Sequence, residues 1–316
     1  MATVLTCGLW SSIPFDFLTK VSGQTHVHTE FIQKFPSPTK HPAWPFLLLR
    51  TLRLNCLTRD YEDLWNALAP LTVSSDAWTP AFSEWPQLTV PTERWTWETP
   101  LRSDFERRAA LVETDALGAI MLGLTAEQLC LIYRVQFGVL RKYENDMWFD
   151  NAGHQIDKYH QAFGVHQQKT DFPTLMDYVA AMEEAGLDAQ RDQPTDAIRT
   201  DARFSAFLEH YEAPFVKANR EREMTLAYEE FTRRLQAVGL LLGDGSEAPG
   251  AEDVDAQAVL EGRLTFVPTA SGAGDGSGPS TPPTAESPGT APPTDFQTPP
   301  DGREAASATA TGERAR

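Results

Sequence analysis

The placement of proline is the feature that most constrains the fold of this chain of 316 residues. Nine of the 23 prolines lie between Pro268 and Pro300, in a stretch rich in Gly, Ser, Thr and Ala that begins near Gly243. This composition buries too little apolar surface to offset the backbone entropy that is lost on folding. The sequence therefore predicts a disordered C-terminal tail over residues 243–316. A plain solubilising tail is favoured over a motif that docks into an aromatic groove.

A second group of prolines lies within residues 70–100, which contain five prolines together with Trp78, Trp85, Trp95 and Trp97. Proline at this density excludes a long helix or a central strand, because it lacks the backbone donor that both structures need. Four tryptophans argue equally against disorder. We expect an irregular strap, meaning a segment without regular structure that lies across an apolar surface.

The other segments place apolar residues at three- and four-residue steps, which is the period of an α-helix. The expected helices cover residues 9–21, 45–57, 61–68, 104–122, 125–143, 173–185 and 217–235, and residues 27–35 are expected to be a short extended or helical piece. Ser103 with Glu106 and Thr125 with Gln128 have the spacing of capping boxes, and residues 147–156 have the pattern of a β-hairpin. The expected fold class is mainly α with a minor β component. The segments are 1–69, 70–100, 101–242 and 243–316.

The charge of the chain depends on the segment. There are 27 Lys and Arg against 44 Asp and Glu, which gives a formal net charge of −17. Taken whole, this charge argues against nucleic acid, because an anionic surface repels phosphate. By segment, however, residues 1–60 carry +3, residues 61–243 carry −12 and residues 244–316 carry −8. The acidity therefore leaves room for DNA contact at the N-terminal segment and makes strong DNA binding by the chain alone unexpected.

Several classes of protein lack support in the sequence. No uninterrupted apolar run is long enough to cross a membrane, and the N-terminus lacks the pattern of a signal peptide. Three cysteines, Cys7, Cys56 and Cys130, are an odd number at wide spacing, which indicates reduced thiols and a cytoplasmic location. We expect no membrane partner.

Motifs for catalysis or metal binding are also missing. No nucleotide-binding glycine motif and no nucleophile elbow is found. The histidines lack the convergent ligands of a zinc site, so ordinary polar histidines are favoured. Glu113 and Asp115 lie two residues apart on an expected helix, so we expect them to point in different directions on a solvated face. Residues 104–143 could form a helix-turn-helix, but an ordinary packed helical hairpin is favoured because the second helix is largely apolar in its first half.

One stretch has a more specific pattern. Ser12-Ile-Pro-Phe-Asp-Phe-Leu-Thr-Lys-Val-Ser-Gly-Gln-Thr-His-Val-His, followed by Phe31-Ile-Gln-Lys-Phe-Pro, resembles the end of the target-recognition region in large restriction–modification DNA methyltransferases. Those enzymes typically have Ser-x-x-Phe-Asp-Tyr, then Gly-x-Thr-His, then an apolar strand ending in Leu-Pro. Further stretches resemble the C-terminal extension of the same family in the same order: residues 49–55, 61–65, 107–117, 124–134 and 212–221. The resemblance covers about residues 9–240 and is closest to the adenine-specific methylases of bacterial phage-defence systems, including the DISARM type.

The family resemblance implies methyl transfer from S-adenosylmethionine to an adenine that is flipped out of a DNA duplex. This chain departs from the family because it lacks the Phe-x-Gly-x-Gly methyl-donor motif, the catalytic Asn-Pro-Pro-Tyr and a nuclease site. It resembles the C-terminal third of such an enzyme, as a split subunit or the product of a truncated reading frame. We therefore expect no catalytic residue and no cofactor here, with S-adenosylmethionine held by a separate catalytic portion that acts as partner.

The candidate DNA contacts lie in the basic N-terminal segment, around a glycine where backbone can approach closely. They are Lys20, Gly23, Thr25, His26, His28 and Lys34. Lysine would neutralise phosphate, and Thr or His would reach phosphate or a base edge of double-stranded DNA. Two alternatives stay open: Thr25 and His26 could simply cap a turn, and the chain could be an acidic helical protein-interaction module without DNA contact. If a missing domain normally covers residues 9–60, an exposed apolar face is expected there.

Overall fold

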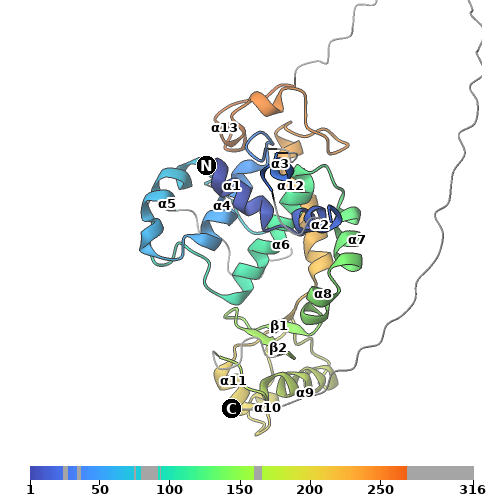
Figure 1. Ribbon diagram of the computed structural model, residues 1–316. Helices are drawn as coiled ribbons and strands as arrows, with labels where there is room; N and C mark the ends of the chain where they lie inside the picture. Colours follow the sequence, from blue (N-terminus) through green and yellow to red (C-terminus); the bar gives the residue numbers. More distant parts are fainter. Residues whose placement is uncertain are drawn as a thin grey trace, which may run out of the picture. The chain divides into compact units, whose positions relative to one another are not determined.

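The computed structural model describes residues 1–23, 28–33, 37–74, 76–79, 92, 94–159 and 166–268. These residues are mainly helical with one small sheet, which confirms the expected fold class at this level (Figure 1). The helices are α1 (Ala2–Trp10), α2 (Ile13–Val21), α3 (Thr29–Ile32), α4 (Trp44–Asn55), α5 (Glu62–Leu68), α6 (Asp104–Met121), α7 (Ala126–Gln136), α8 (Gly138–Glu144), α9 (Asp171–Glu184), α10 (Asp196–Arg199), α11 (Ser205–His210), α12 (Arg220–Ala237) and α13 (Ala256–Leu260). The strands are β1 (Met147–Phe149), β2 (Gln155–Asp157) and β3 (Val216–Lys217), and short 3₁₀ turns include η1 (Arg59–Tyr61), η2 (Ala69–Leu71) and η4 (Ala251–Asp253). All of them belong to one compact unit, Met1–Ser271, and Gly272–Arg316 form a second unit outside the described residues.

The single helix expected over residues 9–21 is in fact two helices. α1 ends at Trp10, and Ser12 has the extended backbone of an N-cap before α2 starts at Ile13. Pro14 lies in the first turn of α2, where its missing N–H costs nothing because the first backbone donors of a helix are unpaired anyway. α1 packs closely on α4 at Gly8, since a Cβ built on Gly8 would fall only 2.0 Å from the Thr51 hydroxyl oxygen.

Both expected capping boxes are present. The Ser103 hydroxyl accepts from the Glu106 N–H at 3.3 Å and starts α6, and the Thr125 hydroxyl accepts from the Gln128 N–H at 3.2 Å and starts α7. The helix expected to run from residue 125 to 143 is interrupted at Phe137, whose backbone leaves the helical region between α7 and α8.

The β-hairpin expected within residues 147–156 is confirmed and gains a third strand. β1 pairs antiparallel with β2, with Trp148 opposite Ile156, and β1 also pairs with β3 in the order β2-β1-β3. β3 has only two residues and starts just after Phe215, so its length is too short for an alternating pattern to reveal it.

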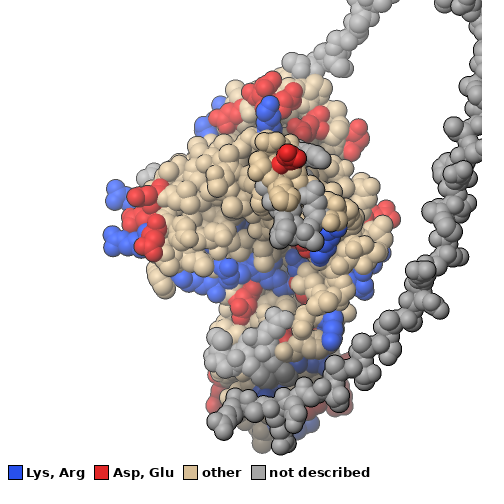
Figure 2. Space-filling model, viewed as in Figure 1, with Lys and Arg blue, Asp and Glu red and all other residues tan. Residues whose placement is uncertain are grey.

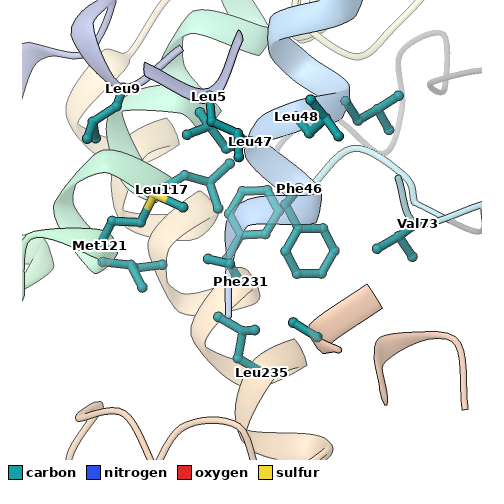
Figure 3. Packing of buried hydrophobic residues seen from close by; sticks show 14 of the residues in the cluster. Leu5, Leu9, Phe46, Leu47, Leu48, Val73, Leu117, Met121, Phe231 and Leu235 are labelled. Atoms are coloured by element: carbon teal, nitrogen blue, oxygen red, sulfur yellow. The ribbon is translucent and has the colours of Figure 1, made fainter. Parts of the chain in front are cut away.

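The main core lies where α1, α4, α6 and α12 meet (Figure 3). Phe46 of α4 and Phe231 of α12 are in ring contact with centroids 5.2 Å apart, and Leu5 and Leu117 lie in the same cluster. A separate aromatic cluster forms around Tyr178 of α9, and its other aromatic members include Phe204, Phe207, Tyr211 and Phe215.

The prediction that the tail starts at Gly243 is wrong for residues 243–268. Ala248, Ala251 and Val259 are buried in the main core, and the Gln257 amide donates to the carbonyls of Pro70 and Thr72. Composition hid this because the segment packs small alanines, with few large apolar residues to mark a core-facing stripe. Residues 269–316 of the predicted tail lie outside the described residues.

The described part of residues 70–100 agrees with an irregular segment. It contains no helix beyond the η2 turn, and the side chains of Trp78 and Trp95 pack against buried clusters. The Trp95 indole donates to the Cys56 carbonyl at 2.7 Å, while Trp97 is 62% exposed. Trp85 lies outside the described residues.

A buried histidine before α4 makes stability depend on pH. His41 is 6% exposed, its Nδ1 accepts from the Ala43 N–H at 3.0 Å, and burial lowers its pKa from 6.5 to about 4. The unfolded histidine therefore binds a proton below pH 6.5 while the folded one stays neutral down to about pH 4. Between these values the free energy of unfolding should fall as the pH falls, by up to about 3 kcal/mol.

Urea unfolding of the wild type and of His41→Gln at pH 7 and pH 4.5 tests this coupling. Between the two pH values the wild type should lose about 2 kcal/mol more stability than the variant, since only the wild type carries the titrating imidazole. Equal losses in both proteins would contradict the assignment to His41.

Candidate nucleic-acid interface

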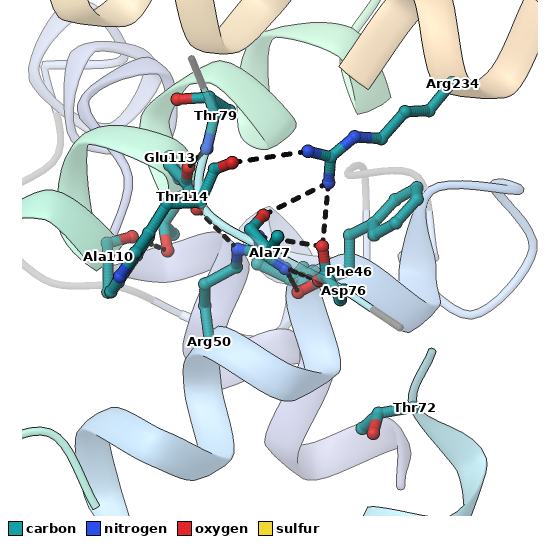
Figure 4. Close-up of polar contacts among 12 residues, drawn as sticks. Phe46, Arg50, Thr72, Asp76, Ala77, Thr79, Ala110, Glu113, Thr114 and Arg234 are labelled. Carbon is teal, nitrogen blue, oxygen red and sulfur yellow. Dashed lines mark hydrogen bonds and ion pairs between the residues drawn. The ribbon is translucent and has the colours of Figure 1, made fainter. Parts of the chain in front are cut away.

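A buried ion-pair network joins α4, α6 and α12 beside the main core (Figure 4). The guanidinium of Arg50 pairs with Asp76 and donates through Nε to Glu113 at 2.8 Å, and Arg234 donates to Asp76 at 2.8 Å. Glu113 also accepts from the Thr79 N–H at 2.8 Å. Burial lowers the pKa of Arg50, but the charges of Asp76 and Glu113 raise it by more, so the guanidinium stays charged.

A second network joins α6 with α8 and the start of α12. Arg220 donates to Asp115 at 2.6 Å and to Glu144 at 2.5 Å. Arg108 bridges Glu144 at 3.0 Å and Glu223 at 2.5 Å. At Glu144 burial raises the pKa, but the charges of Arg108 and Arg220 lower it by more. The carboxylate therefore holds α8 against α12 as an ion.

The prediction that Glu113 and Asp115 form a solvated face is wrong. They do point in different directions, one into each network, but both are buried at 0% and 1% exposure. Burial raises the pKa of both carboxyl groups, against the lowering by Arg50 and Arg220. The error arises because their arginine partners lie 63 and 105 residues away in the sequence, where no local pattern reveals them.

The same burial changes the charge of the N-terminal segment. Arg50 and Arg53 account for two of the six basic residues of segment 1–60, and both are almost fully buried. Arg53 donates to the Thr99 carbonyl at 3.0 Å, and burial lowers its pKa to about 10. The formal +3 of this segment is therefore not a surface charge.

The structure describes three of the six candidate DNA contacts. The Lys20 ammonium lies 2.9 Å from Asp16 and 3.8 Å from the centre of the Phe137 ring. Gly23 has φ +66°, a left-handed conformation, and no atom lies within 4 Å of where its Cβ would be. His28 is exposed at the N-cap of α3. The other three, Thr25, His26 and Lys34, lie outside the described residues, so the grouping of the six stays a prediction.

Lys20 connects this segment to the junction of α7 and α8, a region that the sequence analysis weighed as a helix-turn-helix and did not favour. Phe137 is the junction residue, and the Arg141 N–H donates to its carbonyl one turn further along. Lys142 is exposed on α8 and lies 5.0 Å from the centre of the Tyr159 ring. In the view of Figure 2, Lys and Arg side chains appear below α2 and over α8, whereas carboxylates gather around α13.

Three aliphatic side chains are exposed on the same helices. Leu131, Val135 and Val139 recur at four-residue steps across α7 and α8 with exposures of 53%, 66% and 71%. The apolar face expected within residues 9–60 is smaller among the described residues, where Val21 is the prominent exposed aliphatic. The exposed face of α7 carries the aliphatic side chains of Leu131 and Val135. A recognition helix presents polar side chains to the base edges, so α7 fits the packed helical hairpin that the sequence favoured.

A polar cavity of about 660 Å³ opens between α8, β3 and the start of α12. Its lining includes Tyr133, Arg141, Lys217, Asn219, Arg220 and Arg222. These residues come from α7 and α8, from the stretch 212–221 and from Arg222, which directly follows that stretch. Two of the sequence stretches that carry the family resemblance, 124–134 and 212–221, thus meet at this cavity, and Arg108 and Asp115 of a third support its floor.

Other kinds of site find no support in the described residues. No group of three or more His, Cys, Asp or Glu is arranged to hold a metal ion there. Cys7, Cys56 and Cys130 are free, and burial raises the pKa of Cys56 to about 11, so that thiol is not a reactive thiolate. In the same part of the chain no single helix is long and apolar enough to span a membrane, and the bent pair α6 and α7 meets that criterion only jointly.

Comparisons with known proteins add no identification. No protein-family model, no curated protein and no solved structure matches this chain. The resemblance to adenine-specific DNA methyltransferases therefore stays a prediction from the residues quoted above.

The buried network around Asp76 predicts a large loss of stability on removal of one charge. Asp76→Asn leaves the buried guanidinium of Arg50 with one carboxylate and weakens the hold on Arg234. Breaking such a pair on one side costs about 3–5 kcal/mol. Asp16→Asn is the matched control, because the exposed pair of Asp16 with Lys20 contributes about 0.5 kcal/mol or less. Urea unfolding of both variants measures the difference, and similar losses in the two would contradict a structural role for the Asp76 network.

Proposed function

We propose that this chain is the non-catalytic DNA-recognition and scaffold part of an adenine-specific DNA methyltransferase of a restriction–modification or phage-defence system. It acts with a separate catalytic portion that binds S-adenosylmethionine. The observation that carries the proposal is the contact of Lys20 with Phe137, 3.8 Å from ammonium to ring centre. This contact joins the segment that resembles a target-recognition region to the start of α8, the helix that carries Arg141 and Lys142.

The chemistry of this surface suits a DNA backbone. Arg141 and Lys142 have no carboxylate partner among the described residues, so their charges are available to phosphate. Gly23 leaves an open turn beside Lys20, where a backbone N–H can approach a phosphate closely. His28 is exposed at the N-cap of α3. Phosphate contacts of this kind position a protein on DNA, whereas contacts to base edges specify the sequence.

The scaffold role is supported by the two buried networks on α6. They connect α4, α8 and α12 through ion pairs that are buried on both sides. A rigid support of this kind would hold a recognition surface in one orientation relative to a catalytic partner. Methyl transfer itself would require the adenine to leave the duplex and enter the partner's active site.

The net charge of −17 limits the DNA affinity that is expected of the chain alone. Carboxylates on other faces repel the backbone, so binding by the chain alone should be weak and steeply dependent on salt. Recognition then depends on the partner, which supplies the remaining contacts.

A second candidate function is an acidic helical protein-interaction module that does not touch DNA. The exposed row of Leu131, Val135 and Val139 favours it, because aligned exposed aliphatics are typical of protein contacts. This module would co-purify with its partner and show no DNA affinity even at low salt.

The double variant Lys20→Ala with Lys142→Ala separates the two candidates. Each phosphate contact contributes about 0.9 to the slope of log K against log salt, so the variant should have a slope shallower by about 1–2. Arg59→Ala with Arg203→Ala is the control with the same change in net charge, taken from exposed ion pairs elsewhere. Fluorescence anisotropy on duplex DNA over a salt series measures the slopes. Equal slopes in wild type, variant and control would contradict a contact of this surface with DNA.

A methylation assay tests the functional link directly. Adding this chain to the catalytic portion should raise the rate or restrict the methylated sites, and the Lys20, Lys142 double variant should do so less well than the control variant. Unchanged rate and site choice on adding the chain would overturn the proposed function.

A further inference from the structure

The cavity between α8, β3 and the start of α12 has an unusual balance of charges. Three carboxylates line it, and each is paired: Glu144 with Arg108 and Arg220, Glu221 with Arg134 at 2.9 Å, and Asp146 with Lys158 at 3.8 Å. The buried Glu144 is therefore neutralised within the protein, and the more exposed Glu221 and Asp146 each have one cation beside them.

The cations at the mouth are not neutralised in the same way. Among the described residues no carboxylate pairs with Arg141, Lys217 or Arg222. The Arg141 guanidinium donates to the Arg134 carbonyl at 2.8 Å, and the Lys217 ammonium lies 5.9 Å from the centre of the Trp148 ring. Lys217 and Arg222 are exposed at the rim. Three cations thus converge on one cavity with their charge available to a ligand.

The floor of the cavity offers a hydrogen-bond donor without a partner. Tyr133 is 4% exposed, and its hydroxyl makes no hydrogen bond to any described residue. The hydroxyl lies among the charges of Glu144, Arg220 and Arg141, and burial raises the pKa of Tyr133, so it stays protonated at neutral pH. The hydroxyl is not among the fully buried atoms without a partner, because it opens on the cavity, where it can donate to water or to a ligand.

The walls add neutral donors. The side-chain oxygen Oδ1 of Asn219 caps α12 by accepting from the Arg222 N–H at 3.1 Å. The side-chain N–H₂ of Asn219 can therefore donate to a ligand. The N-terminus of the 18-residue helix α12 lies at the same end, and the two carboxylates of its first turn, Glu221 and Glu223, are paired with Arg134 and Arg108.

We propose that this cavity is a binding pocket for a phosphate group, with Lys217, Arg222 and Arg141 as counter-charges and the Tyr133 hydroxyl as the donor at its floor. Its volume of about 660 Å³ exceeds the needs of a bare phosphate and leaves room for the nucleotide that carries it. As a contact to the DNA backbone, the pocket rests on the proposed function and extends the phosphate surface from α8 to α12. The same chemistry would hold a free phosphate or a free nucleotide, and the experiment distinguishes these sources.

The first measurement titrates the full chain with inorganic phosphate and with dimethyl phosphate, a mimic of the DNA diester, by calorimetry at low salt. We expect a dissociation constant of about 1 mM or tighter for at least one of them. Lys217→Ala with Arg222→Ala should weaken binding about tenfold or more, and Tyr133→Phe by about three- to tenfold. Arg59→Ala with Lys169→Ala is the control that removes one Arg and one Lys from other surfaces.

Two results overturn the pocket. One is the absence of saturable binding of either probe up to about 10 mM, well above the expected constant. The other is equal weakening by the Lys217, Arg222 variant and by the control, which would reduce the effect to net charge. Circular dichroism of each variant confirms that it folds, and Tyr133→Phe removes only one oxygen, so it tests the site with little risk to the fold.

The second measurement uses duplex DNA with the same variants. A loss of DNA affinity in the Lys217, Arg222 variant, with the control unchanged, supports the DNA backbone as the source of the phosphate. Phosphate binding in the pocket with unchanged DNA affinity supports a free phosphate or nucleotide and removes DNA as the source. The Lys20, Lys142 variant tests the proposed function on separate residues, so failure of one idea is distinguishable from failure of the other.

Discussion

The buried charges of α6 are the constraint on which the rest of this structure depends. Within one helix, Arg108, Glu113 and Asp115 all lie below 9% exposure, so each needs an opposite charge inside the protein. Those partners come from α4, α8 and α12. The ion pairs therefore help to determine which elements pack on α6 and in which orientation. The apolar core, which includes the Phe46–Phe231 contact, lies between the same helices α4, α6 and α12.

The candidate site is a consequence of the same arrangement. Glu144 of α8 is held between Arg108 and Arg220, which brings the end of α8 against the start of α12. The cavity forms where these two ends and β3 diverge at the surface. The charge of the cavity follows from the ion pairs beneath it. Glu144 is paired with Arg108 and Arg220, whereas the cations at the rim have no carboxylate partner among the described residues. An acidic protein can in this way present a cationic site, because the net charge says nothing about which charges are already paired.

Local sequence signals predicted local structure well. The capping boxes of α6 and α7 and the β1–β2 hairpin depend on residues three to ten positions apart, so their patterns are visible along the chain. The same reasoning failed for Glu113 and Asp115, which appear solvated until their distant arginines are known. It also failed for residues 243–268, whose alanines find space beside Leu235 and Leu240 in a core built by other elements.

The sequence by itself determined that the chain is mainly helical, where several helices begin, and that Pro-rich segments interrupt them, because propensity, capping and proline geometry act between near neighbours. It also supplied the resemblance that links the N-terminal segment to DNA recognition. Only the tertiary structure decided which charges are buried and which are free. Arg50 counts as a basic residue in the sequence but is an internal counter-ion in the fold. Lys217 and Arg222 belong to the segment 61–243 with its net charge of −12, and yet they line a cavity without a carboxylate partner among the described residues. The reason is that ion pairing depends on distances between elements far apart in the chain, and those distances exist only after packing.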